Sequence, residues 1–304
     1  MTDLMQRLNL ARPTDEDLEA QWPATARAGM LDQIHLRADQ RPRRRRSVSV
    51  LAAAAVVAAV AAGSLVTPED ATAADLRALA RSAVRYDGPV LQEGMWLHEK
   101  TTSLQRNSAT LGDGAVLDTD RESWTGWDGR LYLIERRPSA GWTEYDVLDD
   151  DFPPSYADPT PQFAATLPDE PTELLSYLDS RVSGSSSHDE AMFSALAGLA
   201  TSHTLPARTL AATFEALAQI PHVDTTDVDM SGRPAVEVSY AEDLTSSTQT
   251  LVVDRETGQV LVTHHESRQS DYESTTQVSE VVSEVPAEVL AEFEDHGEGV
   301  RHHS

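Results

Sequence analysis

The sequence contains no cysteine, and Lys100 is its only lysine. Without cysteine the chain cannot form a disulfide framework, a thiolate zinc site or a lipidated N-terminal cysteine anchor. Three motifs of common enzyme classes are also missing: the GxSxG elbow, the HExxH metal motif and the glycine-rich phosphate loop. We therefore expect no enzymatic activity, no catalytic residues, no bound metal and no cofactor, and a fold that depends on its apolar core.

A block of arginines followed by an uncharged segment dominates the N-terminal quarter. The block consists of Arg41, Arg43, Arg44, Arg45 and Arg46, and residues 48–66 after it carry no charge. At about 1.5 Å per residue, a helix of this length spans roughly 28 Å, close to the hydrocarbon thickness of a bilayer. Because flanking arginines stay on the cytoplasmic side, the pattern predicts a single-pass plasma-membrane protein. Residues 1–46 would be a cytoplasmic tail, 47–67 a transmembrane helix and 68–304 an extracytoplasmic domain.

Two other interpretations of the uncharged segment stay open. A buried helix of a soluble protein fits less well, because the segment has almost no polar residues for a solvent side and adjoins the arginine block. A cleaved export signal is favoured by Ala71-Thr72-Ala73, which has the small-x-small form of a peptidase site. Against cleavage, the apolar run is longer than the roughly 7 to 15 residues typical of such signals.

The charge balance differs on the two sides of this segment. Residues 1–47 contain nine arginines and seven acidic residues, whereas residues 68–304 contain fifteen basic and forty-three acidic residues. So acidic a domain repels phosphate backbones and anionic headgroups. We therefore expect no nucleic-acid binding.

The N-terminal tail has a short helical pattern. Thr14 to Asp17 are typical of a helix start, and Met30, Leu31 and Ile34 form a narrow apolar face in a second helix after Pro23. We expect residues 14–39 to bind a cytoplasmic protein partner. A surface-lying arm or a plain linker is the alternative.

Apolar periodicity beyond the anchor predicts an α+β domain. We expect a curved antiparallel sheet, a half-barrel of about eight to eleven strands, with helices on its concave face. The proline-rich segment 149–171 is expected to be a loop without helix. Expected strands are 95–104, 122–137 as a hairpin, 141–148, 234–240, 249–254, 259–266 and 270–282, with a further strand between His222 and the Ser231-Gly232 turn. Expected helices are one capped by Thr72 and three at 171–182, 187–202 and 206–220, the second opened by a capping box of Ser187 and Glu190.

The hairpin at 122–137 contains an Asp128-Gly129 pair, which is typical of two-residue turns. Such a turn pairs Trp127 with Arg130. It would then place Trp124 opposite Leu133 on one face of the sheet.

The histidines do not form a metal motif. His264 and His265 are adjacent in an expected strand and therefore point to opposite faces. His296, His302 and His303 fall in a tail that we expect to be frayed.

An apolar interior between the sheet and the helices is the remaining candidate site. It would either be filled by side chains as an ordinary core or leave room for an acyl chain or another apolar ligand. The residues expected around it are Trp96, Trp124, Leu131, Leu133, Phe193, Leu196, Leu210 and Phe214.

Several short motifs follow one another in a recognisable order. Ala73-Ala74-Asp75-Leu76 opens the domain, Leu217 to Val223 reads LAQIPHV, Gly232-Arg233-Pro234 follows, and Asp254 to Leu261 reads DRETGQVL. With the leader and the anchor, nearly the whole chain resembles a family of actinobacterial single-pass membrane proteins of unknown function. Related extracytoplasmic domains resemble the fold of periplasmic lipoprotein carriers and of an envelope sensor domain that regulates an anti-sigma factor.

This resemblance implies a lipid-like ligand or a regulatory partner. The chain departs from it in two respects: it lacks the acylated cysteine of the mycobacterial carriers, and its cysteine-free tail cannot form the zinc site of the common anti-sigma domain. We expect a membrane-anchored extracytoplasmic binding or sensing module linked to envelope signalling. A tethered carrier of lipid-like apolar ligands and a structural envelope protein are the alternatives.

Overall fold

The computed structural model describes residues 68–106, 116–148, 154–157, 159–183, 186–242, 245–268, 270–296 and 301–303. The chain separates into two units, Met1–Ser64 and Leu65–Ser304, and every described residue belongs to the second unit. The expected cytoplasmic tail, arginine block and membrane span lie outside the described residues. Within the described ranges, no helix combines the length and the apolar character needed to span a membrane.

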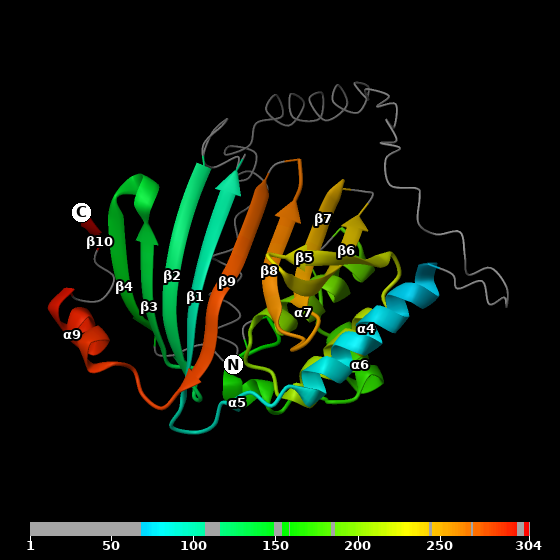
Figure 1. Ribbon diagram of the computed structural model, residues 1–304, viewed down its shortest axis with the longest axis horizontal. Coiled ribbons are helices and arrows are strands. Elements are labelled where there is room, and N and C mark those ends of the chain that lie inside the picture. Colours follow the sequence, from blue (N-terminus) through cyan, green and yellow to red (C-terminus); the bar gives the residue numbers. More distant parts are fainter. Residues whose placement is uncertain are drawn as a thin grey trace, which may run out of the picture. The chain divides into compact units, whose positions relative to one another are not determined.

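In the described part of the chain, ten strands form one antiparallel sheet with the order β10-β4-β3-β2-β1-β9-β8-β7-β6-β5 (Figure 1). Two meanders, β1 to β4 and β5 to β9, are joined where β1 pairs with β9. The expected α+β fold with a curved antiparallel sheet is confirmed. The strands are β1 Trp96–Arg106, β2 Val116–Gly126, β3 Leu131–Arg137, β4 Trp142–Leu148, β5 Val223–Met230, β6 Arg233–Glu242, β7 Ser247–Asp254, β8 Val260–Glu266, β9 Asp271–Val282 and β10 Arg301–His303.

The helices fall into two groups on the sheet. Figure 1 shows α4, α6 and α7 near the strands β5 to β8, and α9 near β4 at the other end. The helices are α4 Pro68–Arg85, α5 Pro161–Ala164, α6 Pro171–Asp179, α7 His188–Thr201, α8 Ala207–Leu217 and α9 Ala287–His296, with a 3₁₀ turn, η1, at Pro138–Ala140.

The two groups pack on opposite faces of the sheet. Successive residues of β1 point to opposite faces of the sheet, so the side chains of Trp96 and Leu97 lie on different faces. Glu99 shares the face of Leu97 and contacts the turn between α7 and α8. Phe293 of α9 packs instead against Tyr132, which pairs with Trp124 on the other face. Helix α9 therefore covers the face that the larger helical block leaves open.

Each helical group encloses its own core. The larger core is mostly aliphatic, and its most buried members include Leu76, Leu79, Leu174, Phe193, Leu196, Phe214, Leu217, Val236, Val238 and Val253. The smaller core under α9 is rich in aromatic side chains and consists of Trp124, Ile134, Tyr145, Val285 and Phe293 with flanking Trp96 and Tyr132. Burial of these apolar faces is the main force that holds each helix on the sheet.

The β2–β3 hairpin has a different register from the one expected. The Gly126 amide donates to the Arg130 carbonyl at 2.7 Å, and the Gly129 amide donates to the Gly126 carbonyl at 3.0 Å. The loop therefore has three residues, with Gly129 at φ +96°, the geometry of a type I turn followed by a left-handed glycine. Trp124 pairs with Tyr132, so the expected pairing with Leu133 is wrong by one residue. Such a slip moves Leu133 to the opposite face.

The start of α7 agrees with the expectation from the sequence, and the start of α4 does not. Ser187 caps α7 by accepting a hydrogen bond from the Glu190 amide at 3.1 Å, as expected. The Glu190 carboxylate reaches back to the Ser186 amide at 2.9 Å. Helix α4, however, already includes residues 68–71, so Thr72 lies within the helix instead of capping it. Thr72 is buried within it.

Two segments expected to lack regular structure contain it. The proline-rich loop includes the single-turn helix α5, because the Thr160 hydroxyl caps the Phe163 amide and Pro161 suits the first helical position. The C-terminal segment forms α9 and β10, where His302 pairs with Thr143. The expectation of a frayed tail is wrong because its apolar residues pack on the aromatic core.

Candidate functional site

A cavity of about 360 Å³ lies where the segment between α4 and β1 meets the turn between α7 and α8. Among the residues that the structure describes, His203 is the only histidine in the lining, and no aspartate, glutamate, lysine or arginine contributes to it. Most of the lining is apolar. The lining residues are Ala83, Tyr86, Gly88, Pro89, Val90, Leu91, Gln92, Trp127, Ala165, His203, Thr204, Leu205, Pro206, Ala207, Leu210, Gln259 and Val281.

One wall of the cavity is formed by the residues that follow the end of α4. The helix stops at Arg85, and Gly88-Pro89 comes three residues later, a pair that cannot continue a helix. The chain then passes through Val90 and Leu91 without regular structure and turns before β1, where the Met95 amide donates to the Gln92 carbonyl at 2.9 Å. Tyr86 and Val90 are large hydrophobic side chains that stay exposed, at 44% and 65%. They give the cavity an apolar rim, a feature that marks binding surfaces more often than ordinary surface.

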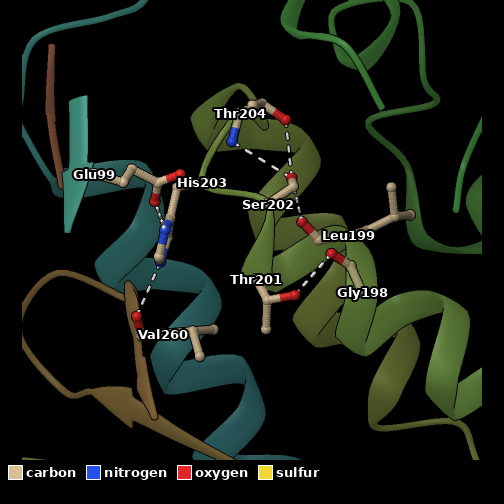
Figure 2. A network of polar contacts seen from close by, with 8 residues as sticks. All are labelled: Glu99, Gly198, Leu199, Thr201, Ser202, His203, Thr204 and Val260. Carbon is tan, nitrogen blue, oxygen red and sulfur yellow. Dashed lines mark hydrogen bonds and ion pairs between the residues drawn. The ribbon is translucent and has the colours of Figure 1, made fainter. Parts of the chain in front are cut away.

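The opposite wall is the short connection between α7 and α8. Helix α7 ends at Thr201, and His203 follows in the left-handed region at φ +52°. Pro206 then precedes the first residue of α8. The Ser202 hydroxyl donates to the Leu199 carbonyl at 2.8 Å and lies 2.9 Å from the Thr204 hydroxyl. The turn is thus closed on itself by local hydrogen bonds, as Figure 2 shows.

His203 ties this turn to two strands of the sheet. Its Nδ1 lies 2.5 Å from Oε1 of Glu99 on β1, and its Nε2 lies 2.9 Å from the carbonyl oxygen of Val260 on β8. Figure 2 shows the ring held between these two acceptors. The His203 side chain is only 4% exposed and that of Glu99 is 17% exposed. The pair is therefore largely removed from water.

The partners of the ring determine its protonation. A carbonyl oxygen and an ionised carboxylate only accept hydrogen bonds, so both ring nitrogens have to donate, and only the imidazolium carries two N–H groups. Burial by itself would lower the pKa of His203. The hydrogen bond and the negative charge of Glu99, with the Val260 carbonyl, outweigh burial and raise the pKa of His203 above its ordinary value. The cavity wall thus contains a buried ion pair.

This arrangement suits binding of an uncharged or mostly apolar group. The volume lies at the lower end of the roughly 300–1,000 Å³ found for ligand pockets. An apolar lining with a few polar groups stabilises a hydrocarbon ligand by removing its surface from water, and the polar groups orient it. Tyr86, Gln92, Thr204 and Gln259 contribute uncharged polar groups to the lining, beside His203.

The eight residues expected around an apolar interior do not surround one cavity. Leu210 lines the 360 Å³ cavity. Phe193, Leu196 and Phe214 are fully buried in the larger core.

The other four expected residues belong to the β1 to β3 half of the sheet. Trp124 is buried in the aromatic core. Trp96 lines a second cavity of about 370 Å³, whose other residues include the exposed charged groups Glu93, Asp128 and Arg130. Leu131 lines a third of about 230 Å³. Leu133 is half-buried on the face opposite Trp124, because the three-residue hairpin loop shifts the register.

Sequence reasoning missed the residues that form the cavity walls. His203 and the segment from Tyr86 to Gln92 were not expected at any site. Two signals were available: the Gly88-Pro89 break immediately after an amphipathic helix, and a histidine in the connection between two apolar helices. Neither signal identifies Glu99 as the partner, because the contact joins residues more than one hundred positions apart.

His264 and His265 point to opposite faces of β8, as expected from strand geometry. Nε2 of His264 lies 2.9 Å from Oδ1 of Asp271 on the neighbouring strand β9. Within the described ranges, no group of three or more histidine, aspartate and glutamate side chains could hold a metal ion.

No protein-family model matches the chain, and no curated protein matches it. Solved structures that show a partial similarity include the following three. The Pseudomonas aeruginosa MucA/MucB complex is 16% identical over 72% of this chain and 60% of its own, with a TM-score of 0.26. Mycobacterium tuberculosis lipoprotein LppX is 10% identical over 68% of this chain and 93% of its own, with a TM-score of 0.24. A putative outer membrane lipoprotein-sorting protein domain from Vibrio parahaemolyticus is 9% identical over 73% of this chain and 98% of its own, with a TM-score of 0.21.

The matched region thus spans about 60% of the chain in the MucA/MucB structure. At these identities and TM-scores, the similarity assigns neither a fold nor a function to this chain.

Proposed function

We propose that the chain is a single-pass plasma-membrane protein whose extracytoplasmic domain, residues 68–304, is a non-enzymatic binding or sensing module for an apolar ligand. The observation that carries the binding role is the 360 Å³ cavity with its apolar lining and exposed apolar rim. The arginine block and the uncharged segment 48–66 support the membrane anchor and its orientation.

The ligand in this proposal is a hydrocarbon chain or ring system with little charge. Among the described lining residues, the His203 imidazolium is the only cation, and Glu99 already neutralises it. A ligand with a buried positive charge would find no carboxylate among the same residues. Burying an unpaired charge is costly. An acyl chain of a lipid, with its headgroup left at the rim, satisfies both conditions.

Native mass spectrometry of the full-length chain, released from mild detergent, tests the binding role. We expect one apolar molecule per chain in the parent protein. Ala207→Trp places an indole into the cavity from an exposed lining position and should remove that molecule. Ala291→Trp, at an exposed position on α9, is the matched control and should retain it. A parent spectrum without ligand, or equal occupancy in both variants, would contradict the proposal.

A tethered carrier of lipid-like ligands is the second candidate, favoured by the same cavity. A sensor has to transmit occupancy to the cytoplasmic tail, whereas a carrier does not. Photo-crosslinking from residues 14–39 of the full-length chain in cells separates the two. If Ala207→Trp changes the proteins crosslinked to the tail, the sensor is supported. An unchanged pattern together with ligand in the parent supports the carrier, and neither ligand nor tail partner leaves the structural envelope role.

A further inference from the structure

The connection between α7 and α8 has a single polar attachment to the sheet in the described part of the chain. The hydrogen bonds of Thr201, Ser202 and Thr204 all stay within the turn and the end of α7. His203 alone reaches β1 and β8, through Glu99 and Val260. The residues directly after it, Thr204 to Ala207, line the cavity.

This attachment needs one proton more than a neutral histidine carries. With a neutral ring, one nitrogen has a lone pair and no hydrogen. That lone pair then faces either the Glu99 carboxylate or the Val260 carbonyl, both of which are acceptors. One of the two contacts is lost in either tautomer, and a buried acceptor without a donor is costly.

We propose that His203 is a proton-controlled latch of the cavity: the imidazolium holds the α7–α8 connection on the sheet, and its deprotonation releases that connection and opens the cavity. The proposal rests on the proposed binding function, since it assigns a control to the same cavity. Ligand exchange would be slow at acidic pH and faster at alkaline pH.

The groups around the ring leave the protonation of the His203–Glu99 pair as the control of cavity opening. β1 contributes Glu99, β8 contributes only the Val260 carbonyl, and β9 contributes the apolar Val281. The end of α4 contributes Tyr86, whose hydroxyl is the other titratable group in the lining. Gln259 and Thr204 are uncharged at every relevant pH. The described part of the lining contains no second cation that could replace the imidazolium.

The direction of the pH effect follows from the raised pKa of His203 in the closed state. A released histidine titrates near 6.5, so the closed state binds more protons between that value and its own higher pKa. The closed state is fully favoured below about pH 6.5 and loses up to about tenfold per pH unit as pH rises through this window. Above the raised pKa the ratio becomes constant again.

A cysteine reporter can measure this opening without any ligand, because the natural chain has no cysteine. Leu210→Cys places a thiol at a buried lining position, and Glu215→Cys places a reference thiol on an exposed position of the same helix. The rate of labelling by N-ethylmaleimide is measured on full-length chain in detergent from pH 5.5 to 9. The ratio of the two rates corrects for the general rise of thiolate with pH. We expect the ratio to rise up to about tenfold per pH unit within the window.

Two substitutions, each combined with the cysteine reporters, show whether the His203–Glu99 pair causes the rise of the labelling ratio with pH. Glu99→Gln lets an amide N–H donate to Nδ1 of a neutral ring while Nε2 still donates to Val260, so the ratio should stay low and constant at all pH values. His203→Gln removes the titrating group and should also make the ratio independent of pH, which provides the test if Glu99→Gln does not fold. His264→Gln removes a second histidine–carboxylate pair, away from the cavity lining, and should leave the rise unchanged.

A constant ratio in the parent, a rise that persists in both Glu99→Gln and His203→Gln, or a rise abolished by His264→Gln would overturn the latch. Such a result would not affect the proposed binding function, because native mass spectrometry tests that function separately. Conversely, a pH-dependent ratio with no bound ligand would support the latch and contradict the binding role.

Discussion

The two ends of the sheet are stabilised in different ways. Strands β5 to β8 are covered by α4 and α6 to α8, and their shared core is mostly aliphatic. Strands β2 to β4 are covered on the other face by one ten-residue helix, α9, over a smaller and mainly aromatic core. Because fewer buried side chains hold α9, we expect it to open more readily than the helical block.

The cavity lies at the boundary between these two ends. Its lining includes Leu210 from the helical block and Trp127 from the β2–β3 hairpin. The His203–Glu99 pair lies on the face of the helical block and joins the α7–α8 connection to β1. This position lets the α7–α8 connection move while both cores stay packed.

The largest expected effect is at the centre of the helical block. Phe214 is fully buried in α8, and Phe214→Ala leaves a cavity that the surrounding side chains cannot fill. We expect the free energy of unfolding to fall by about 3–5 kcal/mol. Urea unfolding of the full-length chain in detergent, followed by circular dichroism, measures this loss. A smaller loss of unfolding free energy than that caused by Phe293→Ala in α9 would show that the helical block is not the more stable end.

A smaller and more local effect is expected at α9. Phe293 packs edge-on against Tyr132 and Tyr145 at centroid distances of 5.2 and 5.5 Å. Phe293→Ala removes the helix's most buried side chain, and we expect α9 to lose about 1.5–3 kcal/mol of its attachment. Hydrogen exchange should accelerate in residues 287–296 while α8 keeps its protection. Equal acceleration in α8 would show that the two ends are not independent.

The smallest expected effect is at the buried carboxylate of β3. Glu135 Oε2 lies 2.7 Å from Nε of Arg121, and Oε1 lies 2.9 Å from Nε of Arg137. Burial by itself would raise the pKa of Glu135, but these arginines hold the pKa below its ordinary value. Such a group stabilises the fold above the ordinary glutamate pKa and loses this effect as pH falls through the lowered pKa.

We therefore expect Glu135→Gln to destabilise the domain at pH 7 by about 1–2 kcal/mol and by less at pH 3. Glu280→Gln, whose side chain is 58% exposed, is the control and should change stability by less than Glu135→Gln. Urea midpoints at the two pH values measure both substitutions. A Glu135→Gln effect that grows as pH falls would contradict the assignment.

Most of the helices and strands could be predicted from the sequence because their apolar patterns are local and periodic. Alternation predicted strands such as β7 and β8, and the three- and four-residue spacing of Leu210, Phe214 and Leu217 predicted α8. Helix α9 was missed although Val289, Leu290 and Phe293 have the same spacing. Its short length and acidic surroundings made it look like a chain terminus.

The site was harder to predict because it depends on one turn and on one long-range contact. Asp128-Gly129 fits both a two-residue and a three-residue hairpin loop, and only packing selects the longer loop. The longer loop inverted Leu131 and Leu133 relative to Trp124, so these two residues do not share its face. The His203–Glu99 contact has no local sequence signal, since it forms only when the helical block rests on the finished sheet.

Photo-crosslinking in living cells tests the central claim most directly. Cells that express the full-length chain are fed a fatty acid with a diazirine near its chain end, irradiated, and the adducts on the purified chain are mapped by peptide mass spectrometry. Our account predicts adducts in residues 86–92 and 203–210, the two segments that contribute most of the cavity lining, and their loss in Ala207→Trp. Adducts confined to residues 48–66, or none at all, would contradict the claim that this domain binds an apolar ligand.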